Sequence, residues 1–277
     1  MVMNGEINKM KQLTAEQIQE NWNKLIQLIK DTFSEDYPDN RREKLLKMYY
    51  YFEDRMAIAP ASGKEHYHNA HVGGYVEHVL HVIDCAVQLK EVWVKNNATI
   101  NFTDEELIFA AMHHDLGKVG DMDKDYYVTQ DSEWHRKNRG EIFTHNGELS
   151  YMTVTDRAIF LLGQFQIPMS ENEYIGLRLT DGLYEEANKN YYISWNPDWG
   201  LKSNIAYILH QADSMATHIE ADMWKRGENA EQKEEKVHLD NIRTAAKVES
   251  SETIKDKDVD MQKRSQDLFD ELFGGKK

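Results

Sequence analysis

The sequence has few of the residues that cross-link small secreted domains or interrupt helices. It contains one cysteine, Cys85, and only four prolines among its 277 residues. A single cysteine excludes a disulfide framework and a zinc site built from cysteines. No run approaches the roughly 18 apolar residues that a transmembrane helix needs, and residues 1–11 lack the apolar centre of a signal peptide. We therefore expect a cytoplasmic protein (in the host cytoplasm if the source is a virus), with no membrane partner and with Cys85 in the core.

Basic residues are also scarce. Lys and Arg number 33 against 48 Asp and Glu, which gives a net charge of -15. A general nucleic-acid binder normally presents a basic surface that displaces the counterions of the phosphates. The charge balance therefore makes a long nucleic acid a less expected partner and favours a small substrate.

Apolar residues recur every three or four positions along most of the chain, which predicts an all-α fold. Thr103 with Glu106 and Ser170 with Glu173 have the spacing of capping boxes, so two helices are expected to begin directly after Thr103 and Ser170. Further helices are expected over residues 14–33, 41–57, 75–94, 156–165 and 205–224. Residues 121–139 have no clear period and predict a long loop or a short hairpin.

The composition divides the chain into three segments. Residues 1–40 are expected to form an N-terminal helical segment, residues 41–226 the main domain, and residues 227–277 a charged extension or tail. The extension ends in an apolar cluster of Leu268, Phe269, Leu272 and Phe273. This cluster either packs on its own domain or inserts into the groove of a partner.

The twelve histidines are unevenly distributed, and five of them lie between His66 and His81. His114 and Asp115 end an apolar helical stretch, and Asp213 lies in another apolar stretch, ILHQADSMA. Buried carboxylates beside histidines need compensation, because an unpaired buried charge is costly. Together with His78 these residues predict a divalent-metal site between three helices, although a hydrogen-bonded core cluster is the alternative. Such a mixed ligand set suits Mn, Fe, Co, Ni, Zn or Mg and does not choose among them.

The same residues resemble the motifs of the HD superfamily of metal-dependent phosphohydrolases. The resemblance rests on GGYVEHVLHV around His78, AAMHHDLGKVGD around His114 and Asp115, and ILHQADSMA around Asp213, and it covers residues 41–224. It implies a helical bundle with the metal in its core, held by those four residues, and hydrolysis of a phosphoester of a nucleotide or nucleic acid. It also implies that Lys118 contacts the substrate phosphate.

Other residues near these motifs are candidates for substrate contacts. His68 and His71 could line the mouth of the pocket and contact phosphate, and His68 could protonate the leaving oxygen. Arg157 and Arg178 could bind phosphate through two hydrogen bonds each. The alternatives are that the histidines are surface loop residues and that the arginines are exposed helix charges.

We therefore expect a hydrolase that cleaves a phosphoester or phosphoanhydride of a small nucleotide, with Asp115, Lys118 and His68 in catalytic roles. Two other hypotheses stay open: a nuclease acting on single-stranded nucleic acid, and a binding module that holds a nucleotide without turnover. The terminal segment SQDLFDELFGG resembles the clamp-binding peptides of replication proteins, particularly those of large bacteriophages. It adds a sliding-clamp-like protein as a candidate partner.

Overall fold

The three-dimensional structure is a computed structural model that describes residues 13–35, 40–194 and 196–226, all of which belong to one compact unit. This part of the chain is mainly helical. Its longer helices are α1 (Ala15–Thr32), α2 (Arg41–Tyr51), α4 (Gly74–Lys95), α5 (Asp104–His113), α7 (Val154–Gln164), α8 (Glu171–Arg178) and α10 (Ile205–Lys225). The shorter elements are α3 (Glu53–Ile58), α6 (Glu133–Arg139), α9 (Lys189–Tyr192), strands β1 (Tyr127–Thr129) and β2 (Phe143–His145), and the 3-10 turns η1 (Leu116–Val119), η2 (Gly182–Tyr184), η3 (Glu186–Asn188) and η4 (Pro197–Trp199). The charged extension and its apolar cluster lie outside the described residues.

Both capping boxes predicted from the sequence are confirmed. The side chains of Thr103 and Ser170 accept hydrogen bonds from the backbone N–H groups of Glu106 and Glu173, and each Glu side chain accepts one from the capping residue in return. These bonds satisfy N–H groups that the first turn of a helix otherwise leaves unpaired. The cap at Thr103 therefore determines where α5, which ends at the candidate metal site, begins.

The single helix predicted over residues 41–57 is wrong. The structure breaks it at Phe52, where φ is -100° and ψ is 7°, so that α2 and α3 are separate helices. The Phe52 ring is buried and packs against the rings of Tyr51 and Phe165. We attribute the break to this packing against α7's C-terminal end, a contact between distant segments that local periodicity does not contain.

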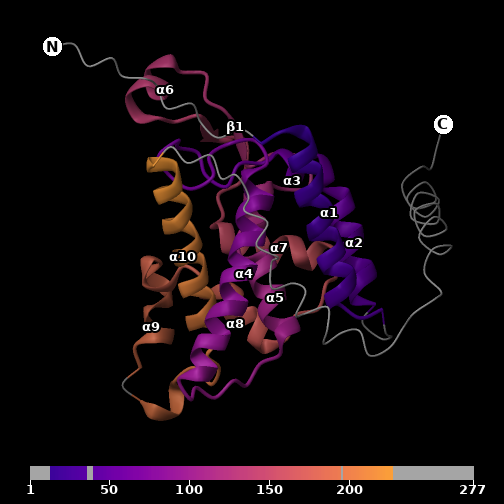
Figure 1. Ribbon diagram of the computed structural model, residues 1–277, viewed down its shortest axis with the longest axis vertical. Helices are drawn as coiled ribbons and strands as arrows, with labels where there is room; N and C mark the ends of the chain where they lie inside the picture. The colour runs from indigo at the N-terminus through magenta and orange to yellow at the C-terminus, as the bar shows by residue number, and fades with distance from the viewer. Residues whose placement is uncertain (1–12, 36–39, 195, 227–277) are drawn as a thin grey trace. The chain divides into compact units, whose positions relative to one another are not determined.

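The region predicted as a loop or short hairpin contains both a strand and a helix. β1 pairs antiparallel with β2, with Tyr127 opposite His145, and α6 lies in the connection between them. No residue of α6 is buried. In Figure 1 this β1–α6–β2 unit projects at one end of the helices.

The core is centred on α4 and α5. α5 is buried from Leu107 to His113, as expected for a helix that is apolar on all sides. Both α4 and α8 pack against α5 and α10 (Figure 1). The three N-terminal helices α1, α2 and α3 pack against one another, and α1 and α3 also pack against α4. Cys85 is buried on α4. No helix within the described ranges combines the length and the apolar composition that crossing a membrane requires.

Candidate metal centre

The four residues predicted as metal ligands meet in the core. His78 lies on the first turns of α4, His114 caps the end of α5, Asp115 follows it directly, and Asp213 lies on α10. The junction after α5 depends on Gly117, since a Cβ at this position would lie 2.0 Å from the carbonyl oxygen of Val154 at the start of α7. Glycine therefore allows η1 to pack closely against α7 while Asp115 faces α4 and α10.

The ligand atoms of these side chains face one another at short range. His78 Nε2 lies 3.3 Å from His114 Nε2, 3.4 Å from Asp213 Oδ1 and 3.7 Å from Asp115 Oδ2. His114 Nε2 lies 3.5 Å from Asp115 Oδ2 and 3.7 Å from Asp213 Oδ1. Two ligand atoms about 2.1 Å from one ion would be about 3.0 Å apart at a right angle and about 3.4 Å apart at a tetrahedral angle. The four side chains could therefore hold one small divalent ion.

The hydrogen bond that each imidazole makes through Nδ1 leaves Nε2 facing the other ligand atoms. His114 Nδ1 donates to the carbonyl of Ala111 at 2.8 Å, and His78 Nδ1 donates to the carboxylate of Glu220 at 3.0 Å. When the two rings are neutral, each therefore presents an Nε2 lone pair toward the two aspartates. Lone pairs and carboxylates facing one another repel unless a cation lies between them, and this is the arrangement found around bound metals.

Protons can supply that positive charge when no metal is bound. Burial alone lowers the pKa of His78, but the Glu220 carboxylate and hydrogen bonds with Asp213 and Glu220 outweigh it and raise the pKa to about 10. Burial likewise opposes the protonation of His114, yet Asp115 and Asp213 raise its pKa. The site thus has a strong electrostatic preference for cations.

Asp115 is anchored on its other side by Lys118. Lys118 Nζ lies 2.6 Å from Asp115 Oδ2 and donates to the carbonyl of Ala61 at 2.8 Å. Burial alone would raise the pKa of Asp115, but Lys118 and His114 hold it well below its ordinary value. The structure therefore places Lys118 against a predicted metal ligand, where it keeps that carboxylate ionised and oriented.

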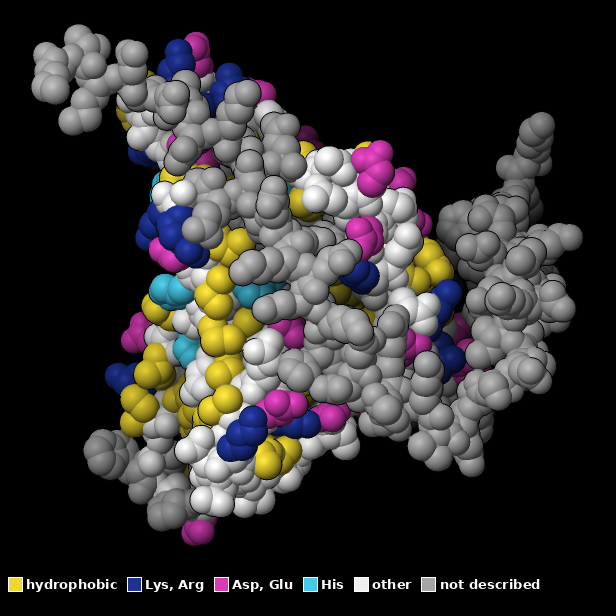
Figure 2. Space-filling model, viewed as in Figure 1, with side chains coloured by type: hydrophobic (Ala, Val, Ile, Leu, Met, Phe, Trp, Pro, Cys, Tyr) yellow, Lys and Arg dark blue, Asp and Glu magenta, His cyan; other side chains and the backbone are white. Residues whose placement is uncertain are grey.

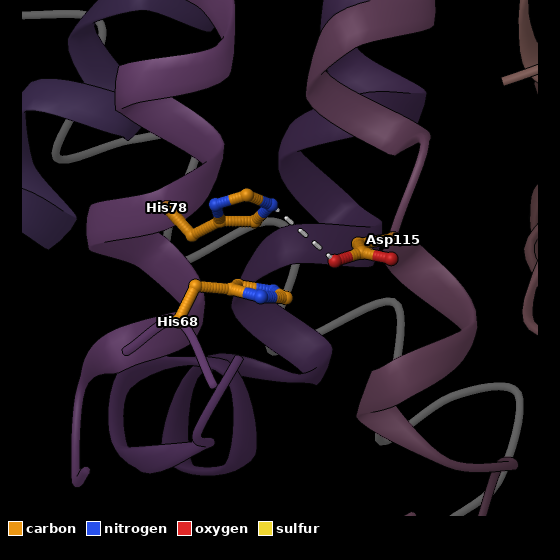
Figure 3. Close-up of side chains that lie close together, drawn as sticks. All are labelled: His68, His78 and Asp115. Carbon is orange, nitrogen blue, oxygen red and sulfur yellow. Dashed lines mark ion pairs between the residues drawn. The ribbon is translucent and has the colours of Figure 1, made fainter. Parts of the chain in front are cut away.

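His68 lies against the same centre, as Figure 3 shows together with His78 and Asp115. Its ring centroid is 4.6 Å from that of His78, and His68, His78 and Asp115 form a second group whose ligand atoms could hold a metal. Burial, followed by the charges of His78 and Lys118, lowers the pKa of His68 to about 3. The imidazole is therefore neutral near pH 7, which suits a ligand or a hydrogen-bond partner better than a proton donor.

The other predicted substrate residues have partners within the protein. His71 is buried, with Nδ1 bonded to the carbonyl of Val72 and Nε2 3.3 Å from Glu77. Arg157 is only 2% exposed and donates to the carbonyl of Ser150. Arg178 donates to the side chain of Asn188 at 2.7 Å. These contacts fix the three side chains in the fold.

The sequence analysis missed Glu220. Its buried carboxylate accepts hydrogen bonds from His78 and, at 2.7 Å, from His81 Nδ1. Glu220 lies seven residues after Asp213 on α10, and residues seven apart share one face of a helix. That spacing places Glu220 on the same helix face as Asp213, and the structure shows that this face meets α4 at His78.

No protein-family model matches this chain, and no curated protein and no solved structure is significantly similar to it. What the site can do is therefore inferred from its own residues and geometry.

Proposed function

We propose that this protein is a metal-dependent phosphohydrolase of the HD type. The observation that carries the proposal is the convergence of two imidazole Nε2 atoms and two carboxylates, in which each Nε2 lies 3.3–3.7 Å from the other and from an oxygen of each carboxylate. A divalent ion held there would lower the pKa of a bound water and neutralise charge on phosphate oxygens. The nitrogen and oxygen ligands are compatible with Mn, Fe, Co, Ni, Zn or Mg.

The chain's own residues supply the positioning. His78, His114, Asp115 and Asp213 would hold the ion, and Lys118 keeps Asp115 ionised and aimed at it. The ring of His68 borders the same space, and its Nε2 has no hydrogen-bond partner among the described residues. That nitrogen is available to a substrate phosphate or to its leaving group, as a hydrogen-bond partner.

A small nucleotide is the substrate that the net charge of -15 favours. The second candidate is a single-stranded nucleic acid. The unburied side chains of Trp134, Lys137 and Arg139 on α6 support it. A binding module without turnover is the third, and the same metal centre would serve it. A sliding-clamp-like partner of the terminal segment stays a separate proposal, since that segment lies outside the described residues.

Hydrolysis assays with Asp115→Asn test the function. Purified protein is incubated with Mn²⁺ and a panel of nucleoside mono-, di- and triphosphates and a short single-stranded oligonucleotide. We expect turnover that EDTA abolishes and that falls by about a thousandfold or more in the variant, as for loss of an essential electrostatic group. Asp198→Asn, at an exposed position in η4, is the matched control and should keep the activity.

Equal turnover by wild type and Asp115→Asn would overturn the proposal. Tight nucleotide binding without product, in the presence of each candidate metal, would favour the binding module instead.

A further inference from the structure

α6 presents an exposed cationic surface in a strongly acidic chain. Its seven residues include Arg136, Lys137 and Arg139, and none is buried. Lys137 and Arg139 line a surface pocket of about 500 Å³ together with Lys64 and His66, which come from the loop before α4. Figure 2 shows Lys and Arg side chains at the end of the molecule where Figure 1 places α6.

Three carboxylates lie beside these cations: Glu65, Glu133 and Glu141. Glu65 lines the pocket itself, and Glu133 pairs with Lys137 at 2.5 Å. Glu141 is shared by two cations, at 3.8 Å from Lys64 and 3.9 Å from Arg139. The exposed Lys137–Glu133 pair stabilises the fold very little, the two pairs of the half-buried Glu141 are long, and phosphate oxygens can replace carboxylates as partners of these cations. The pocket wall itself carries three cations and one carboxylate, so it favours an anion.

Exposed aromatic rings are interleaved with these cations. The Trp134 ring is 56% exposed with the Arg139 guanidinium 5.4 Å from its centroid, and the Tyr67 ring is 48% exposed with Lys64 Nζ at 5.5 Å. Bases that are not paired in a duplex stack on such rings, while neighbouring cations contact the phosphates between them. A double helix keeps its bases stacked on each other and cannot use these faces.

This surface is joined to the loop that borders the metal centre. The N–H of Glu65 donates to the carbonyl of Gly140 at 2.8 Å, and the N–H of Ile142 donates to the carbonyl of Gly63 at 2.9 Å. Both bonds attach the α6 unit to the loop that carries His68, whose ring packs on His78. His66 lines the pocket and is only two residues from His68 along the chain. The pocket and His68 therefore belong to one loop, and the α6 unit is hydrogen-bonded to that loop.

We propose that Lys64, Trp134, Lys137 and Arg139 bind a single-stranded nucleic acid next to the metal centre, so that one of its phosphodiesters reaches the ligands. This rests on the proposed function and selects the second of its candidate substrates, a single-stranded nucleic acid, over the small nucleotide. The overall charge disfavours a long polyanion, but this local surface combines cations with exposed rings, as the pairs Arg139–Trp134 and Lys64–Tyr67 show. A single nucleotide bound at the metal would leave the surface without a role.

Binding to a fluorescent single-stranded oligodeoxynucleotide, followed by anisotropy over a series of salt concentrations, tests the proposal. The full chain is used with EDTA, so binding is measured without hydrolysis. The double variant K137Q/R139Q should bind about tenfold more weakly at low salt, and the slope of log affinity against log salt should fall by about 1.4, or about 0.7 for each lost cation. Trp134→Ala should weaken binding by roughly fivefold or more with the slope unchanged.

Lys47→Gln combined with Lys189→Gln is the matched control, because both lysines are exposed and lie on α2 and α9, away from α6 (Figure 1). It should keep both the affinity and the salt slope. The proposal is overturned if the wild type does not bind the oligonucleotide, if K137Q/R139Q binds like the control, or if a duplex binds equally well with Trp134→Ala unaffected. Metal-dependent turnover that requires Asp115 would survive any of these results, so the two proposals fail separately.

Discussion

Glu220 accepts a hydrogen bond from Nδ1 of His78 at 3.0 Å, and both side chains are buried. A carboxylate in this position holds the proton on Nδ1 and keeps Nε2 free as a ligand. The same carboxylate bonds His81, so it also ties the first turns of α4 to the last turns of α10. Glu220 therefore acts on the metal centre through His78.

The first prediction concerns this pair. Glu220→Gln replaces a carboxylate, which only accepts, by an uncharged amide that can also donate, so the proton is held less firmly on Nδ1 of His78. We expect the affinity for Mn²⁺ or Co²⁺, measured by titration calorimetry, to fall by about 10- to 100-fold. Asp222→Asn, an exposed acid two residues further along α10, should leave metal affinity unchanged. A Glu220→Gln protein that binds metal as well as the wild type would contradict the positioning role.

Metal binding should release protons. Since the pKa of His78 in the metal-free protein is raised to about 10, the ring is protonated at neutral pH and must lose that proton to become a ligand. The affinity should therefore increase with pH, by about one logarithmic unit per pH unit between pH 7 and 9 for one released proton. Calorimetry in buffers with different ionisation enthalpies counts the protons, and a count of zero would contradict this account.

Much of the site could be predicted because its signals are local. The residue types and spacing of His78, His114 and Asp115 are properties of short segments, and the capping box at Thr103 depends on residues three positions apart. Glu220 could not be assigned in the same way, because its role depends on which face of α10 meets α4.

Local sequence patterns also could not predict which side chains are buried. Arg157 follows a helix start and reads as a surface charge, yet the structure buries it against the Ser150 carbonyl. The break at Phe52 has the same origin, since the ring it packs against, Phe165, is far along the chain. Burial and helix ends of this kind are decided by contacts between distant segments.

Lys118→Met should destabilise the metal-free protein more than the metal-loaded one. The substitution leaves the buried Asp115 carboxylate without its cation, and breaking a buried pair in this way costs about 3–5 kcal/mol. A bound divalent ion would compensate the same carboxylate. Chemical denaturation with EDTA and with saturating Mn²⁺ measures both losses in the free energy of unfolding.

Lys124→Met is the control for that comparison. Lys124 forms an exposed pair with Glu148 at 3.1 Å, and such pairs contribute about 0–1 kcal/mol. Its loss should be small and equal in both conditions. If Lys118→Met cost the same with and without metal, Lys118 and the ion would not share Asp115.

The last prediction concerns His113, whose ring is fully buried between Phe109 and Tyr49. Burial, together with the charges of Arg41 and His114, lowers its pKa from 6.5 to about 3 despite the hydrogen bond to the Phe109 carbonyl. Between about pH 3 and pH 6.5, His113 therefore binds a proton in the unfolded chain but not in the folded one. Stability should fall as the pH decreases below about 6.5, by up to about 1.4 kcal/mol per pH unit from this residue.

Denaturant unfolding of metal-free wild type and His113→Phe between pH 7 and pH 5 separates this contribution, because the phenyl ring cannot take up a proton. The variant should lose stability less steeply with falling pH, whatever its stability at pH 7. Tyr49→Phe is the control, since it alters the neighbouring ring without removing a group that titrates in this range. Parallel pH profiles for wild type and His113→Phe would show that His113 takes up its proton equally in the folded and unfolded chains, against the burial that the structure assigns to it.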